Sequence, residues 1–204
     1  MSLEIWTAFV LASAALLAIP GPTVTVVVGH SIARGPSAAW ATVPGVTLGD
    51  FVAMTASLLG AGAVLAASAT LFTALKVAGA AYLIWLGVKM WRDRGDALAA
   101  SSSAPRAPFR SIFANCFLVT AFNPKDIVFF VAFVPQFVDP AKPLLAQFVI
   151  LEATFLTMVA ANIALWSLTA GRLRDAFARP GRMRVLNRVG GGALIGAGLL
   201  TARA

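Results

Sequence analysis

The feature that most constrains the fold is a long stretch of chain that is almost free of charge. From Gly35 to Leu75 the only charged residue is Asp50. A single helix through this stretch would be roughly 60 Å long, about twice the thickness of the hydrocarbon layer of a bilayer. The stretch therefore turns back on itself. We expect two membrane-spanning helices here, over about residues 37 to 65 and 70 to 91, with the turn near Ala66 to Thr70.

The overall composition agrees with a membrane protein. Hydrophobic residues make up 59% of the 204 residues, charged residues make up only 12%, and the mean hydropathy is +0.86. Soluble domains carry about 25% charged residues. We therefore exclude a water-soluble fold and expect an all-α integral membrane protein.

The same length test places four further spans. They cover about residues 5 to 29, 111 to 138, 143 to 171 and 185 to 202. The last of these is the shortest, because arginines precede it closely. Residues 92 to 110 contain an Arg-Asp-Arg-Gly-Asp sequence and a run of serines, which predict a solvated linker. We expect about six transmembrane helices in one domain over residues 1 to 204, with three helices in about 3 to 91 and three in about 111 to 204.

Positive charge falls mainly on one side of this arrangement. The loops and span ends on that side carry Arg34, Lys89, Arg92, Arg94, Arg106, Arg110, Arg172, Arg174, Arg179, Arg182, Arg184 and Arg188. Only Lys142 and Arg203 lie on the opposite side. Loops rich in Lys and Arg stay in the cytoplasm, so we expect a multi-pass protein of the inner membrane with its linker in the cytoplasm and both termini outside. The net charge of +8 then reflects topology and not nucleic-acid binding, since no aromatic or helix-turn-helix context accompanies the arginines.

The first predicted span contains the helix-breaking sequence Pro20-Gly21-Pro22. The two prolines lack the amide hydrogens that would bond to the carbonyls of Leu16 and Ala18. Backbone groups that lose their partners at membrane depth need a protein partner or a water-filled cavity. We expect this span to form two half-helices. A kinked helix that serves only packing is the alternative.

The fourth predicted span repeats the device at Asn123-Pro124-Lys125-Asp126. Pro124 frees the carbonyl of Thr120, and two ionisable residues follow it. The ends of half-helices at membrane depth offer amides to anions and carbonyls to cations, and an amino-acid zwitterion needs both. The sequence therefore predicts a substrate site here, with an ion pair between Lys125 and Asp126, or snorkelling of the two side chains, as the structural alternative.

Two carboxylic acids lie deep in predicted spans. Asp50 is close to the middle of the second span, and Glu152 has a similar position in the fifth. Charged groups are rare in such places and mark ion or proton pathways. We expect these carboxyl groups to bind a coupling proton or the ammonium group of a substrate. Pairing with Lys125 or Lys76 is the competing explanation.

The breaks and the carboxyl groups recur together along the chain. Pro22 and Pro124 are separated by the same number of residues as Asp50 and Glu152. With three spans in each half, the second half would enter the membrane upside down relative to the first. This is the inverted-repeat plan of many secondary transporters. The sequence therefore predicts two inverted three-helix repeats.

At these residues the chain resembles the lysine exporter and homoserine/threonine exporter superfamily, known as the LysE/RhtB type. The matching segments are Pro20 to Pro22, Gly45 to Asp50, Lys76 to Gly87 and Asn123 to Lys125, in that order. The resemblance implies a small secondary transporter that exports an amino acid or a derivative, driven by the proton gradient. It implies no cofactor, and its partners would be the substrate, protons, the lipid bilayer and, in a homodimer, a second copy of the chain.

Carried over residue by residue, the resemblance marks a translocation site. Its residues are Pro20, Gly21, Pro22, Gly49, Asp50, Asn123, Pro124 and Lys125. To these the polar residues at membrane depth add Asp126, Glu152 and Lys76. Lys76 and Tyr82 belong to the third-span motif, where packing or interface anchoring is an alternative role. The motifs leave the transported side chain open.

Three other functions can be weighed against the sequence. An enzyme is disfavoured, because the chain has one histidine and lacks the HExxH and GxSxG motifs. A heavy-metal exporter of the same superfamily is an alternative, but one Cys and one His are a poor set of ligands for a soft metal. A membrane scaffold that transports nothing would leave Asp50, Lys125 and Glu152 without a role.

Overall fold

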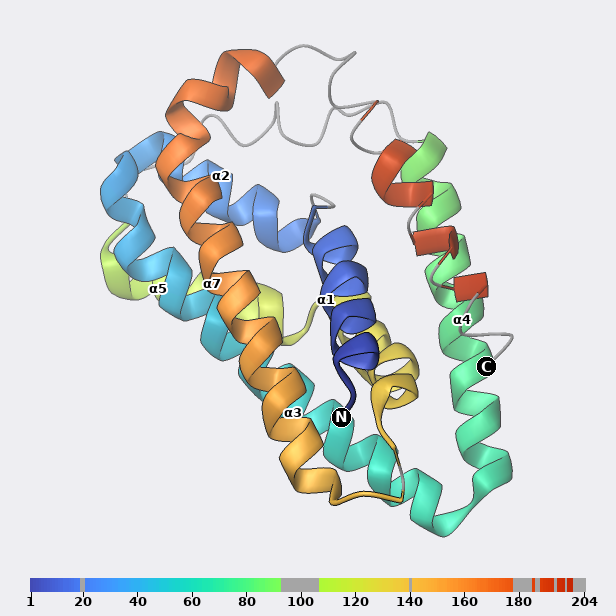
Figure 1. Ribbon diagram of the computed structural model, residues 1–204. Coiled ribbons are helices and arrows are strands. Elements are labelled where there is room, and N and C mark those ends of the chain that lie inside the picture. Colours follow the sequence, from blue (N-terminus) through green and yellow to red (C-terminus); the bar gives the residue numbers. More distant parts are fainter. Residues whose placement is uncertain are drawn as a thin grey trace.

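The computed structural model describes residues 1–18, 21–92, 107–139 and 141–177, together with 185, 188–192, 194–196 and 198–199. Every regular element in these residues is helical (Figure 1). The elements are α1 Leu3–Ala18, α2 Pro22–Arg34, η1 Pro36–Ala38, α3 Ala39–Ala67, α4 Ala69–Arg92, α5 Phe109–Ala121, α6 Pro124–Val128, η3 Phe129–Phe133, η4 Val134–Phe137 and α7 Leu144–Phe177. Pro20, most of the predicted linker and much of the predicted sixth span lie outside the described residues.

The uncharged stretch forms the two helices expected of it. α3 and α4 meet at Ser68, whose extended backbone (φ −164°, ψ 115°) ends α3. Figure 1 shows α3 running down to one end of the molecule and α4 running back along the right-hand side of the molecule. The predicted spans agree with these helices to within two residues at each end, because a turn was required by length alone.

The spans that contain Pro22 and Pro124 are each broken, as predicted. The helices of the first pair, α1 and α2, make an angle of 56°. In the second pair α5 ends before Asn123, and the segment Pro124–Phe137 continues at 40° to it. Taken as one span each, the two bent pairs are apolar and long enough to cross a membrane. The segments Pro36–Val64 and Leu144–Ala170 are long enough alone, which gives up to four candidate spans among the described residues.

The helices pack around α3. It lies against α5 on one side and α7 on another, while η3 separates it in part from α4. Two glycines let α3 approach α5: a Cβ at Gly45 would lie 2.7 Å from the Phe113 carbonyl oxygen, and one at Gly49 would lie 2.8 Å from that of Phe117. The small-residue pattern in α3 therefore has its partner within the same chain.

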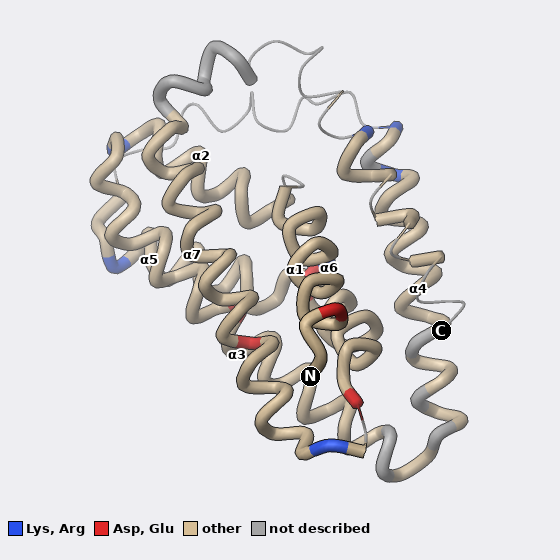
Figure 2. The backbone as a smooth tube through the Cα atoms, viewed as in Figure 1, with Lys and Arg blue, Asp and Glu red and all other residues tan. Residues whose placement is uncertain are grey.

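The described charges are unevenly placed. Arg34 lies in the last turn of α2, and Lys89 and Arg92 lie in the last turn of α4. These helix ends lie at the same end of the molecule, and Lys142 precedes α7 at the opposite end (Figure 2). An all-helical, multi-span membrane protein is thus established, while the count of six spans and the inverted repeats remain predictions.

Candidate functional site

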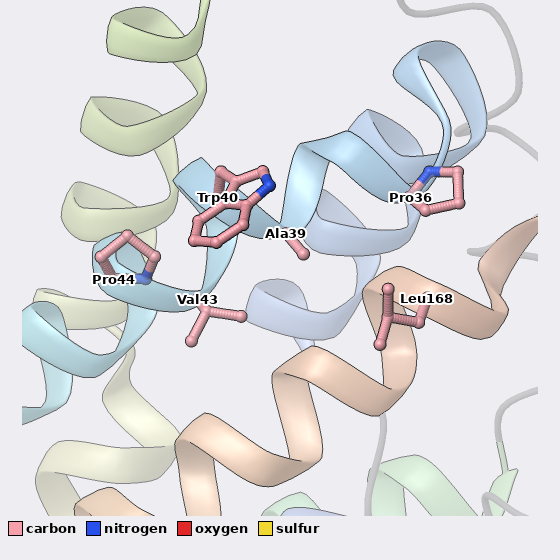
Figure 3. A pocket seen from close by; sticks show the side chains of 6 residues that line it. All are labelled: Pro36, Ala39, Trp40, Val43, Pro44 and Leu168. Atoms are coloured by element: carbon pink, nitrogen blue, oxygen red, sulfur yellow. The ribbon is translucent and has the colours of Figure 1, made fainter.

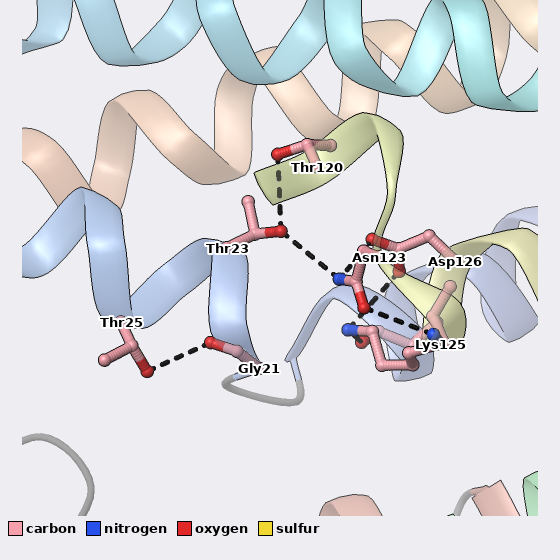
Figure 4. Close-up of polar contacts among 8 residues, drawn as sticks. Gly21, Thr23, Thr25, Thr120, Asn123, Lys125 and Asp126 are labelled. Carbon is pink, nitrogen blue, oxygen red and sulfur yellow. Dashed lines mark hydrogen bonds and ion pairs between the residues drawn. The ribbon is translucent and has the colours of Figure 1, made fainter. Parts of the chain in front are cut away.

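Asn123 joins the two broken spans. Its Oδ1 accepts a hydrogen bond from the Lys125 amide at 3.2 Å and so caps α6. Its Nδ2 donates to Asp126 Oδ2 at 2.7 Å and to Thr23 Oγ1, in the first turn of α2, at 3.2 Å. Thr120 at the end of α5 also donates to Thr23 Oγ1, at 3.3 Å. Figure 4 shows these bonds linking the start of α2 to the second break.

Lys125 lies between the two breaks. Its side chain is buried, with the residue 7% exposed, and Nζ is 3.6 Å from Asp126 Oδ1. Nζ also donates to the Leu16 carbonyl at 3.5 Å, which is the carbonyl that Pro20 leaves without a helical partner. A Cβ at Gly21 would touch this ammonium group at 3.5 Å. The structure therefore brings together the Lys125 side chain and Gly21, one residue from each of the two breaks.

Asp50 belongs to the same charged group. It is 3% exposed and lies close enough to Lys125 and Asp126 to interact with both charges. Within the described part of the chain its Oδ1 has no hydrogen-bond partner. Gly49, the residue before it, packs against the backbone of α5. Gly49 thus contributes to the site by letting α3 come close to α5, and not by a side chain of its own.

The remaining predicted site residues do not join this cluster or cannot be assigned to it. Glu152 is half-buried, and its Oε1 accepts a hydrogen bond from Thr55 at 2.6 Å across the α3–α7 contact. Pro22 and Pro124 are exposed and occupy the first positions of α2 and α6. The Lys76 backbone lies in α4, its side chain lies outside the description, and so does Pro20.

Sequence reasoning missed Thr23 and Thr120. Both are buried, and their hydroxyl groups complete the hydrogen-bond network around Asn123. One signal was available, because each threonine lies within a few residues of a helix-breaking proline. Such positions are where freed backbone groups need polar neighbours.

A second Lys–Asp pair shows what the same residue types do at the surface. Lys142 Nζ lies 3.2 Å from Asp139 Oδ2, and the Lys142 side chain is 56% exposed. The pKa of Asp139 is lowered by the backbone N–H of Ala141, which donates to its carboxylate, and by the Lys142 ammonium group. Exposed pairs of this kind contribute little to stability. The pair provides a natural control for the buried one.

An apolar groove of about 520 Å³ lies away from these residues (Figure 3). It is lined by Pro36, Ala39, Trp40, Val43, Pro44 and Leu168. Trp40 is 84% exposed, as expected of a side chain that faces lipid or the headgroup boundary. The groove offers no charged group to a zwitterion. Among the described residues, no three His, Cys, Asp or Glu side chains gather to hold a metal ion.

These features define a class: a helical membrane protein of several spans, with a buried charged site where two helices are broken. The model of the LysE type translocator family matches residues 14–204. The chain belongs to this family, which confirms the resemblance drawn from its motifs. It is therefore an efflux transporter and not an enzyme.

Named relatives cover the chain over most or all of its length. A homoserine/homoserine lactone efflux protein of Salmonella typhimurium is 35% identical, over 100% of this chain and 99% of the relative. An uncharacterized membrane protein of Vibrio cholerae is 31% identical over 100% of this chain and 99% of its own length. A leucine efflux protein of Salmonella typhimurium is 28% identical over 69% of this chain and 66% of the relative. No solved structure matches the chain.

Proposed function

We propose that the protein exports a small amino acid, or a close derivative of one, across the inner membrane in exchange for protons. The observation that carries this proposal is the meeting of Lys125 with Gly21 at the two broken helices. The relatives support the substrate class, since their names specify efflux of homoserine, its lactone and leucine. The positive loops of the sequence support an inner-membrane protein with the linker in the cytoplasm.

The charges around the two breaks suit the two ends of an amino acid. α2 begins at Pro22 with no side-chain cap at Gly21, so the amides of its first turn are open to an anion. Lys125 lies beside Gly21, the residue before this turn. We assign the substrate carboxylate to these amides and to Lys125. We assign its ammonium group to Asp50, which offers the unpartnered Oδ1.

The same carboxyl group accounts for exchange with protons. When Asp50, Lys125 and Asp126 are all ionised, the three carry one surplus negative charge in a buried site, which is costly without a cation. Either a substrate ammonium group or a proton at Asp50 removes that cost. Because one carboxyl group cannot hold both, the two cations alternate there. Alternation of this kind couples export of the substrate to entry of the proton.

Dipeptide loading tests the proposal. Cells that express the chain are loaded with a panel of dipeptides, and the release of each amino acid is followed by mass spectrometry. We expect faster release of at least one small amino acid, and slower release after the proton gradient is collapsed. A panel in which no amino acid leaves faster than from cells without the chain contradicts the proposal, and favours a scaffold or a metal exporter.

A further inference from the structure

Three polar side chains outside the charged cluster have buried oxygen atoms without a partner in the described part of the protein. They are Ser13 Oγ in α1, Thr47 Oγ1 in α3 and Asn162 Oδ1 in α7. Ser13 is fully buried. Several other helical hydroxyl groups, among them those of Ser31 and Thr154, bond to the carbonyl four residues earlier. The three oxygen atoms are therefore open to a hydrogen bond from elsewhere.

Side-chain contacts between the helices place Thr47 and Asn162 at one level. α3 and α7 run in opposite directions, because Thr42 bonds to Ser167 and Thr55 bonds to Glu152. Thr47 is five residues after Thr42, and Asn162 is five residues before Ser167. Because the two helices are antiparallel, Thr47 and Asn162 lie at the same level.

Ser13 falls at the same level from a third side. α1 runs along α7 in the same direction (Figure 1), and Trp6 Nε1 donates to Thr154 Oγ1 at 3.1 Å. Ser13 is two turns beyond Trp6 in α1, and Asn162 is slightly more than two turns beyond Thr154 in α7. Because Trp6 and Thr154 are bonded and the helices run in the same direction, Ser13 and Asn162 lie at about the same level.

All three residues lie on the inner faces of their helices. Ser13 follows the buried Phe9 by one turn, Thr47 precedes Met54 by two turns, and Asn162 follows Phe155 by two turns. Phe9, Met54 and Phe155 belong to one core cluster. Thr47 is also one turn from Asp50 along α3, so the level that the three residues share lies next to that carboxyl group of the charged site.

We propose that Ser13, Thr47 and Asn162 form a specificity subsite that receives the side-chain hydroxyl group of a short amino acid. This inference rests on the proposed function, because it takes Asp50 to hold the substrate ammonium group. Thr47 lies ~4.5 Å from Asp50 along the helix axis, about the separation of the ammonium and hydroxyl groups in a short hydroxylated amino acid. The subsite contains two hydroxyl groups and an amide and no charge, so it suits a neutral polar group.

An apolar side chain fits the subsite poorly. It would cover three buried polar oxygen atoms without bonding to them, and unpaired groups of this kind are what allow a site to reject an analogue that lacks a hydroxyl group. A cationic side chain would find no further carboxylate among these three residues. The chemical class assigned is therefore a short hydroxylated amino acid.

The test compares homoserine with norvaline, which has a methyl group where homoserine has the hydroxyl group. Purified protein in liposomes is assayed for proton-driven transport of each. We expect wild-type kcat/KM to be about tenfold or more higher for homoserine. In Thr47→Val and Asn162→Leu the ratio should fall to within about twofold while norvaline is still transported, because each change removes a polar oxygen at similar size.

Three further variants keep the result decisive. Thr47→Ser retains the hydroxyl group and should retain the wild-type ratio. Thr157→Val is the matched control, because Thr157 is exposed on α7 and its hydroxyl group bonds to the Ala153 carbonyl. Ser13→Ala, the smallest change, decides the matter if the larger changes prevent insertion, and it should lower the ratio.

The outcomes separate this inference from the proposed function. A wild-type protein that transports both compounds equally, or a ratio that survives in Thr47→Val, Asn162→Leu and Ser13→Ala, overturns the subsite while amino-acid export stands. A wild-type protein that transports neither compound nor any other amino acid overturns the proposed function and the subsite with it.

Discussion

Asp50 and Glu152 stand at matching distances from the two helix breaks, yet the structure gives them different surroundings. Asp50 is 3% exposed and lies among the charges of Lys125 and Asp126. Glu152 is half-buried at the α3–α7 contact and accepts a short hydrogen bond from Thr55. The comparison shows that a repeated pattern in sequence does not give repeated surroundings. Lys125 and Asp126, at the break in the second half of the chain, lie beside Asp50 of the first half.

The residues before the two carboxyl groups differ in the same way. Gly49 lets α3 approach the α5 backbone, whereas Leu151 fills the core with a fully buried side chain. A close helix crossing holds Asp50 deep in the protein. Glu152 follows the buried side chain of Leu151, and its own carboxyl group is only half-buried.

Removing the charge of Asp50 is expected to have the strongest effect. Asp50→Asn should insert and fold, since it removes a charge at membrane depth, but should lose gradient-driven export because it binds neither a proton nor an ammonium group. Export is measured in liposomes with and without a pH gradient, at matched amounts of inserted protein. Export at the wild-type rate by this variant would remove Asp50 from the coupling mechanism.

The close crossing at Gly49 predicts a smaller loss that is mainly one of stability. A Cβ in Gly49→Ala would lie 2.8 Å from the Phe117 carbonyl oxygen and 2.9 Å from Thr120 Cβ. Overpacking of this kind costs ~1–3 kcal/mol, read as a lower melting temperature in detergent. Gly60→Ala in the same helix is the control, because a Cβ there meets nothing within 4 Å. Equal melting temperatures for the two variants would show that the crossing is looser than described.

Glu152→Gln should change least. The amide oxygen of glutamine can still accept the hydrogen bond from Thr55, and no described contact links Glu152 to the charged cluster. We expect export to keep its dependence on the pH gradient and most of its rate. A loss as complete as that of Asp50→Asn would restore the symmetric roles that the sequence predicted for the two carboxyl groups.

The sequence predicted features that depend on length and on single residues. The paired helices α3 and α4 followed from the run without charge, and the two breaks followed from Pro22 and Pro124 together with their neighbours. The sequence also predicted that the carbonyls freed at the breaks need partners, and Lys125 donates to one of them, that of Leu16.

Features that depend on register between helices were not accessible from one sequence. The bond from Thr55 to Glu152 joins α3 and α7, and the bond from Asn123 to Thr23 joins the two halves. Their partners are set by how the helices are aligned, which no local pattern specifies. For the same reason no local pattern in the sequence marks Ser13, Thr47 and Asn162, which share a level only through the alignment of α1, α3 and α7.

The most direct test of the site is whether Lys125 recognises the substrate carboxylate. Binding of an exported amino acid and of its carboxyl-amidated analogue is measured by calorimetry on purified wild type, Lys125→Ala and the control Lys142→Ala, whose lysine pairs with Asp139 at the surface. We predict that Lys125→Ala weakens binding of the acid about tenfold or more, the size expected for a buried charged hydrogen bond, and binding of the amide by much less. Lys142→Ala should alter neither. Equal losses for acid and amide in Lys125→Ala would contradict a carboxylate site between the two broken helices.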